Sequence, residues 1–126
     1  PQLVDGSEKV LSYLKGKYKL ILATLGDREV QQKKIENSGL ENNFSAIYIM
    51  HFKNTEEYRG IIKDHQLKKE RTWLIGNSVR SDLNPGLELG LNCILIPAVT
   101  WKFEEEKPIS NKYIELESLT EILALL

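Results

Sequence analysis

Four short apolar runs, each followed by a helical or polar segment, constrain the fold of this chain more than any other feature. Each run is only six or seven residues long and rich in β-branched and aromatic side chains, which favours strands buried on both faces. Strands that alternate with helices predict an α/β fold with a mostly parallel sheet and helices on both of its faces. The runs are residues 18–24, 44–50, 71–76 and 92–97.

Capping residues mark where the predicted helices begin and end. Helices are expected to start at Ser7, at Asp27, at Thr55 and at either Ser118 or Thr120, since short polar side chains accept hydrogen bonds from the first N–H groups of a helix. Gly39 ends the second of these helices. The expected helices cover residues 4–15, 28–37, 56–65, 84–90 and 118–126, and a short edge strand is expected in residues 113–118.

Composition excludes several classes of protein. A chain of 126 residues fits a single domain. The net charge of −1, with Lys and Arg scattered among Glu and Asp, does not indicate a nucleic-acid or membrane-surface partner. Cys93 is the single cysteine and lies in an apolar run, so we expect a buried thiol and a reducing compartment. No apolar run approaches the ~18 residues that a membrane span needs, and we expect a cytoplasmic protein.

Polar residues follow three of the predicted strands. Thr24 ends the first strand, Lys53 follows the second, and Asn77, Ser78 and Asp82 follow the third. Ligands of open α/β sheets bind at the carboxyl ends of the strands. A Thr hydroxyl can hydrogen-bond phosphate oxygens, a Lys can neutralise their charge, and carboxylate and amide oxygens suit Mg²⁺. Together these residue types indicate a phosphoryl site.

Three stretches of the sequence resemble, in order, motifs of the haloacid dehalogenase (HAD) superfamily. "LILATLGDREVQQKKIENSGLENNF" resembles the second motif, in which a Ser or Thr follows a core strand. "IMHFKNTEEYRGII" resembles the third, a Lys ahead of a helix, and "IGNSVRSDLNPGLELGLNCILIP" resembles the fourth, usually written G-D-S-x-x-x-D. The similarity covers about residues 3–101. It implies a three-layer sandwich with a mostly parallel, Rossmann-like sheet of the HAD type.

The resemblance also implies roles for individual residues in a Mg²⁺-dependent phosphohydrolase. Thr24 and Lys53 would be the catalytic residues that bind the phosphoryl group, and Ser78 would support them as a hydrogen-bond donor. Asp82 and Asn77 would lie in or beside the metal shell. The substrate would be a small phosphorylated metabolite.

Two departures from the family pattern affect this interpretation. Asn77 stands where the family usually has Asp, which removes one negative charge from the metal site. The family's first motif, D-x-D-x-T, supplies the nucleophile and the acid/base, and it does not occur in these 126 residues; Asp5, Asp27 and Asp64 lack its context. We therefore expect residues 1–126 to form a single core domain that is incomplete at its N-terminus and inactive by itself.

The missing motif lies on the central strand of the family sheet, so the strands at residues 18–24 and 71–76 are expected to flank a gap. Exposed donors and acceptors of apolar strands promote association. An N-terminal segment, a second chain, a swapped element or direct pairing of the two strands could fill the gap, and we favour the first.

Simpler explanations exist for the same residues. Thr24 could cap a turn, Lys53 could be solvated, and Asp82 could cap a helix through its N–H groups. The chain could also be a non-catalytic α/β module, a degenerate HAD relative that pairs with another chain or segment. A receiver domain shares the architecture but needs an acidic pair after its first strand, and the sequence has none there.

Overall fold

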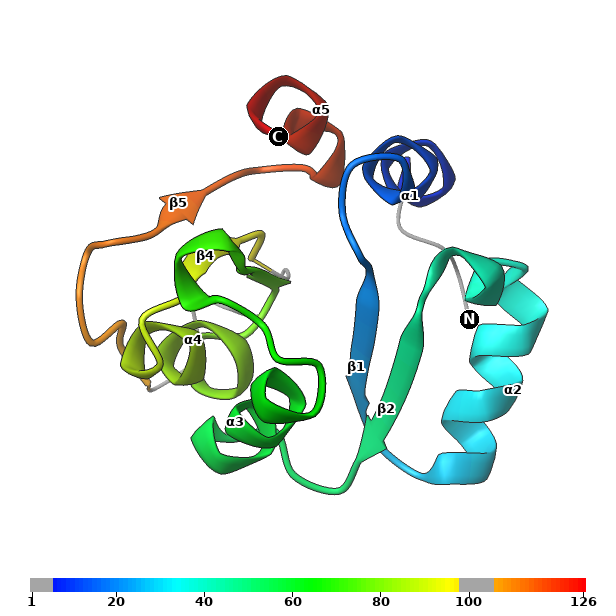
Figure 1. Cartoon of the computed structure of the whole chain (residues 1–126), viewed down its shortest axis with the longest axis horizontal. Coiled ribbons are helices and arrows are strands. Elements are labelled where there is room, and N and C mark those ends of the chain that lie inside the picture. The colour runs from blue at the N-terminus through cyan, green and yellow to red at the C-terminus, as the bar shows by residue number, and fades with distance from the viewer. Residues whose placement is uncertain (1–5, 98–105) are drawn as a thin grey trace. The chain divides into compact units, whose positions relative to one another are not determined.

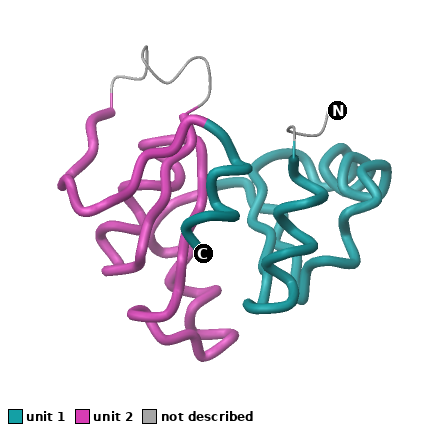
Figure 2. The backbone as a smooth tube through the Cα atoms, turned by 90° about the horizontal axis from the view of Figure 1, so that it is seen from above, with its two compact units in different colours: residues 1–52, 118–126 teal, residues 53–117 magenta. Residues whose placement is uncertain are grey.

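The computed structural model describes residues 6–97 and 106–126, which fall into two compact units (Figure 2). Unit 1 comprises the chain up to Phe52 together with Ser118–Leu126, and unit 2 comprises Lys53–Glu117. Both units contain helices and parallel strands, so the α/β class predicted from the sequence is confirmed. The prediction that all 126 residues form a single domain stays a prediction.

The sheet of unit 1 has two parallel strands. β1 (Ile21–Leu25) pairs with β2 (Ala46–Met50) along their whole length (Figure 1). The connection between them contains α2 (Arg28–Ser38), which packs alongside β2, and a 3₁₀ turn, η1 (Glu41–Asn43). This strand–helix–strand order is the one that the apolar runs predicted.

The two ends of α2 are set by the residues that the sequence indicated. The Asp27 carboxylate accepts a hydrogen bond from Val30 N at 3.1 Å, which satisfies one of the free N–H groups of the first turn. Gly39 ends the helix with φ 72°, a left-handed conformation that glycine adopts without a steric penalty. Both predicted caps are therefore confirmed.

The remaining helices of unit 1 come from the two ends of the chain. α1 (Ser7–Lys15) packs against the 3₁₀ turn η5 (Leu119–Glu121) and the short helix α5 (Ile122–Leu125). The predicted cap Ser7 was wrong, because α1 begins after Gly6 and has no side-chain cap. Ser118 stands at the N-cap position of η5, as predicted, but its side chain makes no capping hydrogen bond. Burial of apolar side chains, Val10 and Ile122 among them, stabilises this pairing instead.

The sheet of unit 2 has three parallel strands in the order β3–β4–β5. β3 (Trp73–Gly76) pairs with β4 (Asn92–Leu95), and β4 pairs with the short β5 (Ile114–Glu115). The edge strand expected in residues 113–118 is thus present, although it is only two residues long. Residues 98–105, which include Trp101, lie outside the described part of the chain.

Helical segments in unit 2 begin earlier than the sequence suggested. α3 (Thr55–Asp64) is capped by Asn54, whose side chain accepts from Glu57 N at 2.9 Å. The expected cap, Thr55, was wrong: its hydroxyl donates to Glu88 at 2.9 Å. The other segments are a 3₁₀ turn, η2 (Lys69–Arg71), a π-helical turn, η3 (Val79–Leu83), and the helix α4 (Asn84–Glu88) that continues it.

The core of unit 2 is centred on β4 and η3. Cys93, Ile94 and Leu95 of β4 are fully buried, as are Val79 and Leu83 of η3. Because two apolar side chains of this π-helical turn pack in the core, the turn is held in place, and its polar residues are constrained to point in one direction.

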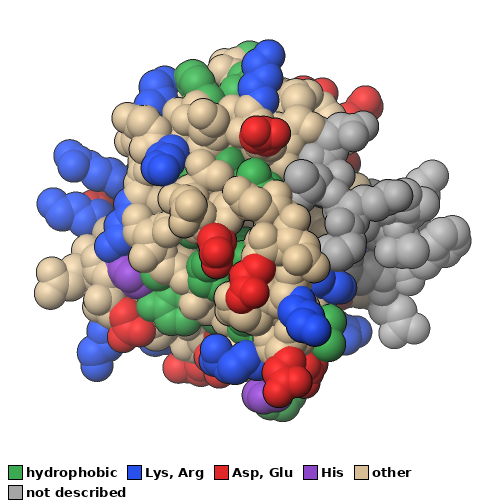
Figure 3. Space-filling view, turned by 90° about the vertical axis from the view of Figure 1, so that its right-hand side faces the viewer, with side chains coloured by type: hydrophobic (Ala, Val, Ile, Leu, Met, Phe, Trp, Pro, Cys, Tyr) green, Lys and Arg blue, Asp and Glu red, His purple; other side chains and the backbone are tan. Residues whose placement is uncertain are grey.

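Lys and Arg side chains are interspersed with Asp and Glu on the face in Figure 3. None of the helices in the described part of the chain is long and apolar enough to cross a membrane.

Cys93 is expected to resist alkylation in the folded protein. Its side chain is 2% exposed, and burial raises the pKa of the thiol to about 11, so the reactive thiolate is scarce at pH 8. Pulse labelling with iodoacetamide at pH 8 should leave Cys93 unmodified until denaturant unfolds the protein. Rapid labelling without denaturant would contradict the packing around β4.

β1 and β3 each have a partner strand on one side only, within residues 6–97 and 106–126. They are the two strands that were expected to flank a gap. β1 belongs to the sheet of unit 1 and β3 to the sheet of unit 2. The other edge of each strand keeps backbone groups that can pair with a further strand.

Candidate active site

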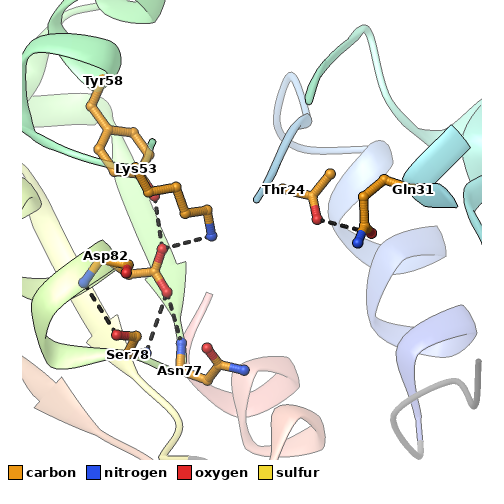
Figure 4. A network of polar contacts seen from close by, with 8 residues as sticks. Thr24, Gln31, Lys53, Tyr58, Asn77, Ser78 and Asp82 are labelled. Carbon is orange, nitrogen blue, oxygen red and sulfur yellow. Dashed lines mark hydrogen bonds and ion pairs between the residues drawn. The ribbon is translucent and has the colours of Figure 1, made fainter. Parts of the chain in front are cut away.

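Four of the predicted site residues come together in unit 2, at the carboxyl end of β3 (Figure 4). β3 ends at Gly76, and Asn77 and Ser78 follow it directly. The π-helical turn η3 then brings Asp82 back over these two residues, while Lys53 reaches the same carboxylate from the segment before α3. The structure therefore brings Lys53, Asn77, Ser78 and Asp82 together at one location, and their roles stay predictions.

Asp82 is the centre of this cluster. Its side chain is 4% exposed, and both of its carboxylate oxygens accept hydrogen bonds. Oδ2 accepts from the backbone N–H groups of Asn77 and Ser78 at 3.2 and 3.3 Å. Oδ1 accepts from Lys53 Nζ at 2.8 Å and from the Tyr58 hydroxyl at 2.7 Å. A buried carboxylate with four donors and a cationic partner is well satisfied as an anion.

Local sequence explains how Asp82 reaches these donors. The Ser78 side chain accepts a hydrogen bond from Ser81 N at 3.1 Å and so begins the helical turn immediately after β3. The helix expected from residue 84 is preceded by a further helical turn, since residues 79–83 are π-helical and continue into α4. The alternative in which Asp82 caps a helix was wrong, because Ser78 occupies the cap position and Asp82 binds the N–H groups of the two residues after β3.

Gly76 makes this close approach possible. A Cβ atom at residue 76 would overlap the side chain of Asp82, so any residue larger than glycine would displace the carboxylate or the strand end. Glycine is the usual solution where a backbone segment must approach another group closely. The Gly-Asn-Ser sequence therefore places the carboxylate directly against the end of β3.

Lys53 is held as part of a buried ion pair. Its side chain is 16% exposed, and its ammonium lies 2.8 Å from Asp82 Oδ1. An ammonium has three N–H donors, and the ion pair uses one of them. The others can bind an anion such as a phosphoryl oxygen at the same strand end.

Tyr58 is the residue of this cluster that the sequence did not identify as functional. Its place on the apolar face of α3, with Ile61, suggested a packing role. Burial raises the pKa of its hydroxyl, and the negative charge of Asp82 and the hydrogen bond to it raise the pKa further. The hydroxyl therefore stays protonated and donates to Asp82. The available signal was that a buried Tyr requires a hydrogen-bond partner.

Thr24 belongs to unit 1, where it lies near the carboxyl end of β1. Its hydroxyl lies 3.4 Å from the side-chain oxygen of Gln31, the longest of the contacts drawn in Figure 4. Thr24 is thus at the end of a parallel strand, as predicted. Its convergence with Lys53 and Asp82 on one phosphoryl group stays a prediction.

The residues described in unit 2 fit part of a magnesium site. Asn77 and Asp82 offer the oxygen ligands that this hard cation prefers. Residues 6–97 and 106–126 contain no cluster of three or more His, Cys, Asp or Glu side chains that could hold a metal ion. Because each oxygen of Asp82 already accepts two hydrogen bonds, the Asn77 amide is the more available ligand of the two. Further ligands would have to come from other residues.

The Lys53–Asp82 pair joins the stretches that resemble the third and fourth motifs of the haloacid dehalogenase class of hydrolases. A model of the haloacid dehalogenase-like hydrolase family matches residues 1–96, and the chain belongs to this family. The resemblance drawn from the sequence is therefore confirmed over most of the chain.

Individual relatives agree with this assignment. The chain is 28% identical over 134 residues to HAD-hydrolase YfnB of Bacillus subtilis (strain 168), covering 99% of this chain and 54% of that protein. A crystal structure of YfnB bound to magnesium superposes with a TM-score of 0.84 at 26% identity, over 99% of this chain and 56% of that one. A haloacid dehalogenase-like family hydrolase from Xanthomonas campestris gives 0.83 at 27% identity, over 98% and 55%. The chain spans about half the length of these relatives.

Proposed function

We propose that this chain is the phosphate-binding part of a Mg²⁺-dependent phosphohydrolase that acts on a small phosphorylated metabolite. The observation that carries the proposal is the Lys53–Asp82 ion pair at the carboxyl end of β3 in a chain of the HAD-like hydrolase family. A fixed cation at that position stabilises the negative charge that develops during phosphoryl transfer.

The proposed reaction is hydrolysis through an aspartyl-phosphate. A carboxylate outside these 126 residues attacks phosphorus in line, the alcohol of the ester leaves, and water then cleaves the acyl phosphate. Lys53 binds an oxygen of the phosphoryl group, and Thr24 and Ser78 are proposed to donate hydrogen bonds to it. When bound, magnesium neutralises charge on the phosphoryl oxygens and orients them, with Asn77 as a ligand and Asp82 in or beside its shell.

A further strand is proposed to complete the sheets and carry the nucleophile. β1 and β3 each have one edge without a partner among the described residues, which supports this proposal. A parallel strand that pairs with such an edge would end beside the other strand ends, where ligands of α/β proteins bind. An N-terminal segment is the favoured source, and a second chain is the alternative.

The test is phosphatase activity of the natural polypeptide that carries this chain. With p-nitrophenyl phosphate, hydrolysis should require Mg²⁺, fall to the background rate in EDTA and recover when Mg²⁺ is restored. Trapping the intermediate in acid with a ³²P-labelled substrate should label an aspartate outside these 126 residues. A rate that is indifferent to EDTA, or no hydrolysis of any phosphate ester, would contradict the proposal.

A further inference from the structure

The Tyr58 hydroxyl and the Lys53 ammonium bind the same oxygen of Asp82. The two donor–acceptor distances are 2.7 Å and 2.8 Å, and the tyrosine is 7% exposed. Tyr58 follows Lys53 by five residues and lies one turn into α3, whose buried face anchors its ring. The hydroxyl is therefore held by the helix and is not free to leave the carboxylate.

Two donors on Oδ1 limit how Lys53 can bind. A carboxylate oxygen accepts hydrogen bonds along two lone-pair directions. With Tyr58 on one of them, the ammonium of Lys53 has the other, and its remaining N–H donors are left for a ligand. Without the hydroxyl, Oδ1 has a free lone pair in a buried position, so the ammonium can move across the oxygen to compensate.

The other oxygen fixes the plane of the carboxylate. Oδ2 accepts from the N–H groups of Asn77 and Ser78, so rotation of the carboxylate would break these bonds. Tyr58 thus donates to a carboxylate that is already bound to the end of β3. Loss of its hydrogen bond to Oδ1 would therefore move the Lys53 ammonium and leave the backbone in place. The hydroxyl is neutral because burial and the nearby carboxylate raise its pKa, and it leaves the charge balance of the ion pair unchanged.

We propose that Tyr58 is a positioning residue that acts through Asp82 to hold the Lys53 ammonium in the orientation that binds a phosphoryl oxygen. This role rests on the proposed function for its catalytic consequence. Its structural consequence, a fixed ammonium, does not depend on activity and can be measured separately.

The experiment compares Tyr58→Phe with Ile61→Val in the natural polypeptide. The Phe variant removes only the hydroxyl, and the Val variant removes a buried methylene from the same helix without touching Asp82. The Phe variant should lose roughly tenfold or more in kcat/KM, and inorganic phosphate should inhibit it correspondingly less, since small displacements of a positioned group are costly. The Val variant should lose thermal stability and keep both values within about twofold.

A spectroscopic measurement separates this inference from the proposed function. In the wild-type protein the Lys53 ammonium should give a slowly exchanging ¹H–¹⁵N cross-peak at low temperature, and the Tyr58 hydroxyl proton should be protected from solvent. Tyr58→Phe should broaden or abolish the Lys53 cross-peak, while Ile61→Val retains it. An unchanged cross-peak in the Phe variant would overturn the inference, whether or not the wild-type protein hydrolyses phosphate esters.

Discussion

Replacing Asp82 with alanine is expected to lower the free energy of unfolding by about 3–5 kcal/mol, the usual cost of removing one partner from a buried ion pair. The substitution leaves the Lys53 ammonium, whose side chain is 16% exposed, without its carboxylate. It also leaves the Tyr58 hydroxyl and the N–H groups of Asn77 and Ser78 without the acceptor they use. Each buried donor that loses its partner adds a desolvation cost.

Urea denaturation of the natural polypeptide, followed by tryptophan fluorescence and circular dichroism, would measure this loss. Glu56→Ala is the matched control, because it removes a carboxylate from an ion pair with Arg59 whose Glu side chain is 80% exposed. Exposed pairs contribute about 0.5 kcal/mol or less, so the control should be nearly neutral. A loss below about 1 kcal/mol for Asp82→Ala would mean that the four hydrogen bonds are not formed in solution.

Lys53→Met separates the two contributions to that loss. In this variant Asp82 keeps the Tyr58 hydroxyl and both backbone donors, so it remains solvated by the protein. A double-mutant cycle between Lys53 and Asp82 should give a coupling free energy of about 1–3 kcal/mol, as contacting residues of one network do. The loss in free energy of unfolding on Asp82→Ala that exceeds this coupling free energy is assigned to the hydrogen bonds from Tyr58 and the backbone N–H groups.

The fold could be predicted from the sequence wherever a single physical signal was strong. The apolar runs at β1, β2, β3 and β4 are short and continuous, and each became a strand of a parallel sheet. Asp27 and Gly39 bounded α2 because one offers a hydrogen-bond acceptor and the other tolerates a left-handed conformation. At α3 the predicted cap Thr55 was wrong, because the side chain of the preceding residue, Asn54, accepts the hydrogen bond of the first turn.

The π-helical turn after β3 could not be predicted in the same way. Residues 77–83 are mostly polar, and their two apolar residues, Val79 and Leu83, are too few to show a helical period. Burial of these two side chains decides the conformation, and that depends on the β4 core against which they pack. The consequence for the site is large, since the turn carries Asp82 back to the end of its own strand.

The chemistry of the candidate site was predictable, whereas its hydrogen-bond connections were not. The sequence predicted Lys53 and Asp82 in one neighbourhood, because both follow strands that were expected to end at one edge of a parallel sheet. The sequence did not indicate that Asp82 would bind two backbone N–H groups and the hydroxyl of Tyr58, 24 residues away. The Asp82 carboxylate reaches these donors because it packs directly against Gly76, and the sequence alone does not show this close approach.

Supplying a strand that ends in D-x-D-x-T should protect the open edges of β1 and β3 from hydrogen exchange. Both strands have backbone groups on one edge that no other described strand satisfies. Pairing converts those amides from solvent-exposed to sheet-bonded, and their exchange should slow by about 10³-fold or more, as opening then requires several kcal/mol. Exchange measured by NMR on the 126-residue chain, with the segment added on the same polypeptide or a separate one, would show the change.

The control segment has the same length and sequence except for proline at alternate positions. Proline has no N–H and cannot form the ladder of a central strand, so this segment should leave the exchange rates of β1 and β3 unchanged. The outer strand β5 is a second, internal control, because it pairs with β4 and its protection should not depend on the added segment. Equal protection by both segments would indicate non-specific association. No protection by either would mean that these edges are not where the nucleophile strand binds, and the proposed phosphohydrolase would then lack a route to its catalytic aspartate.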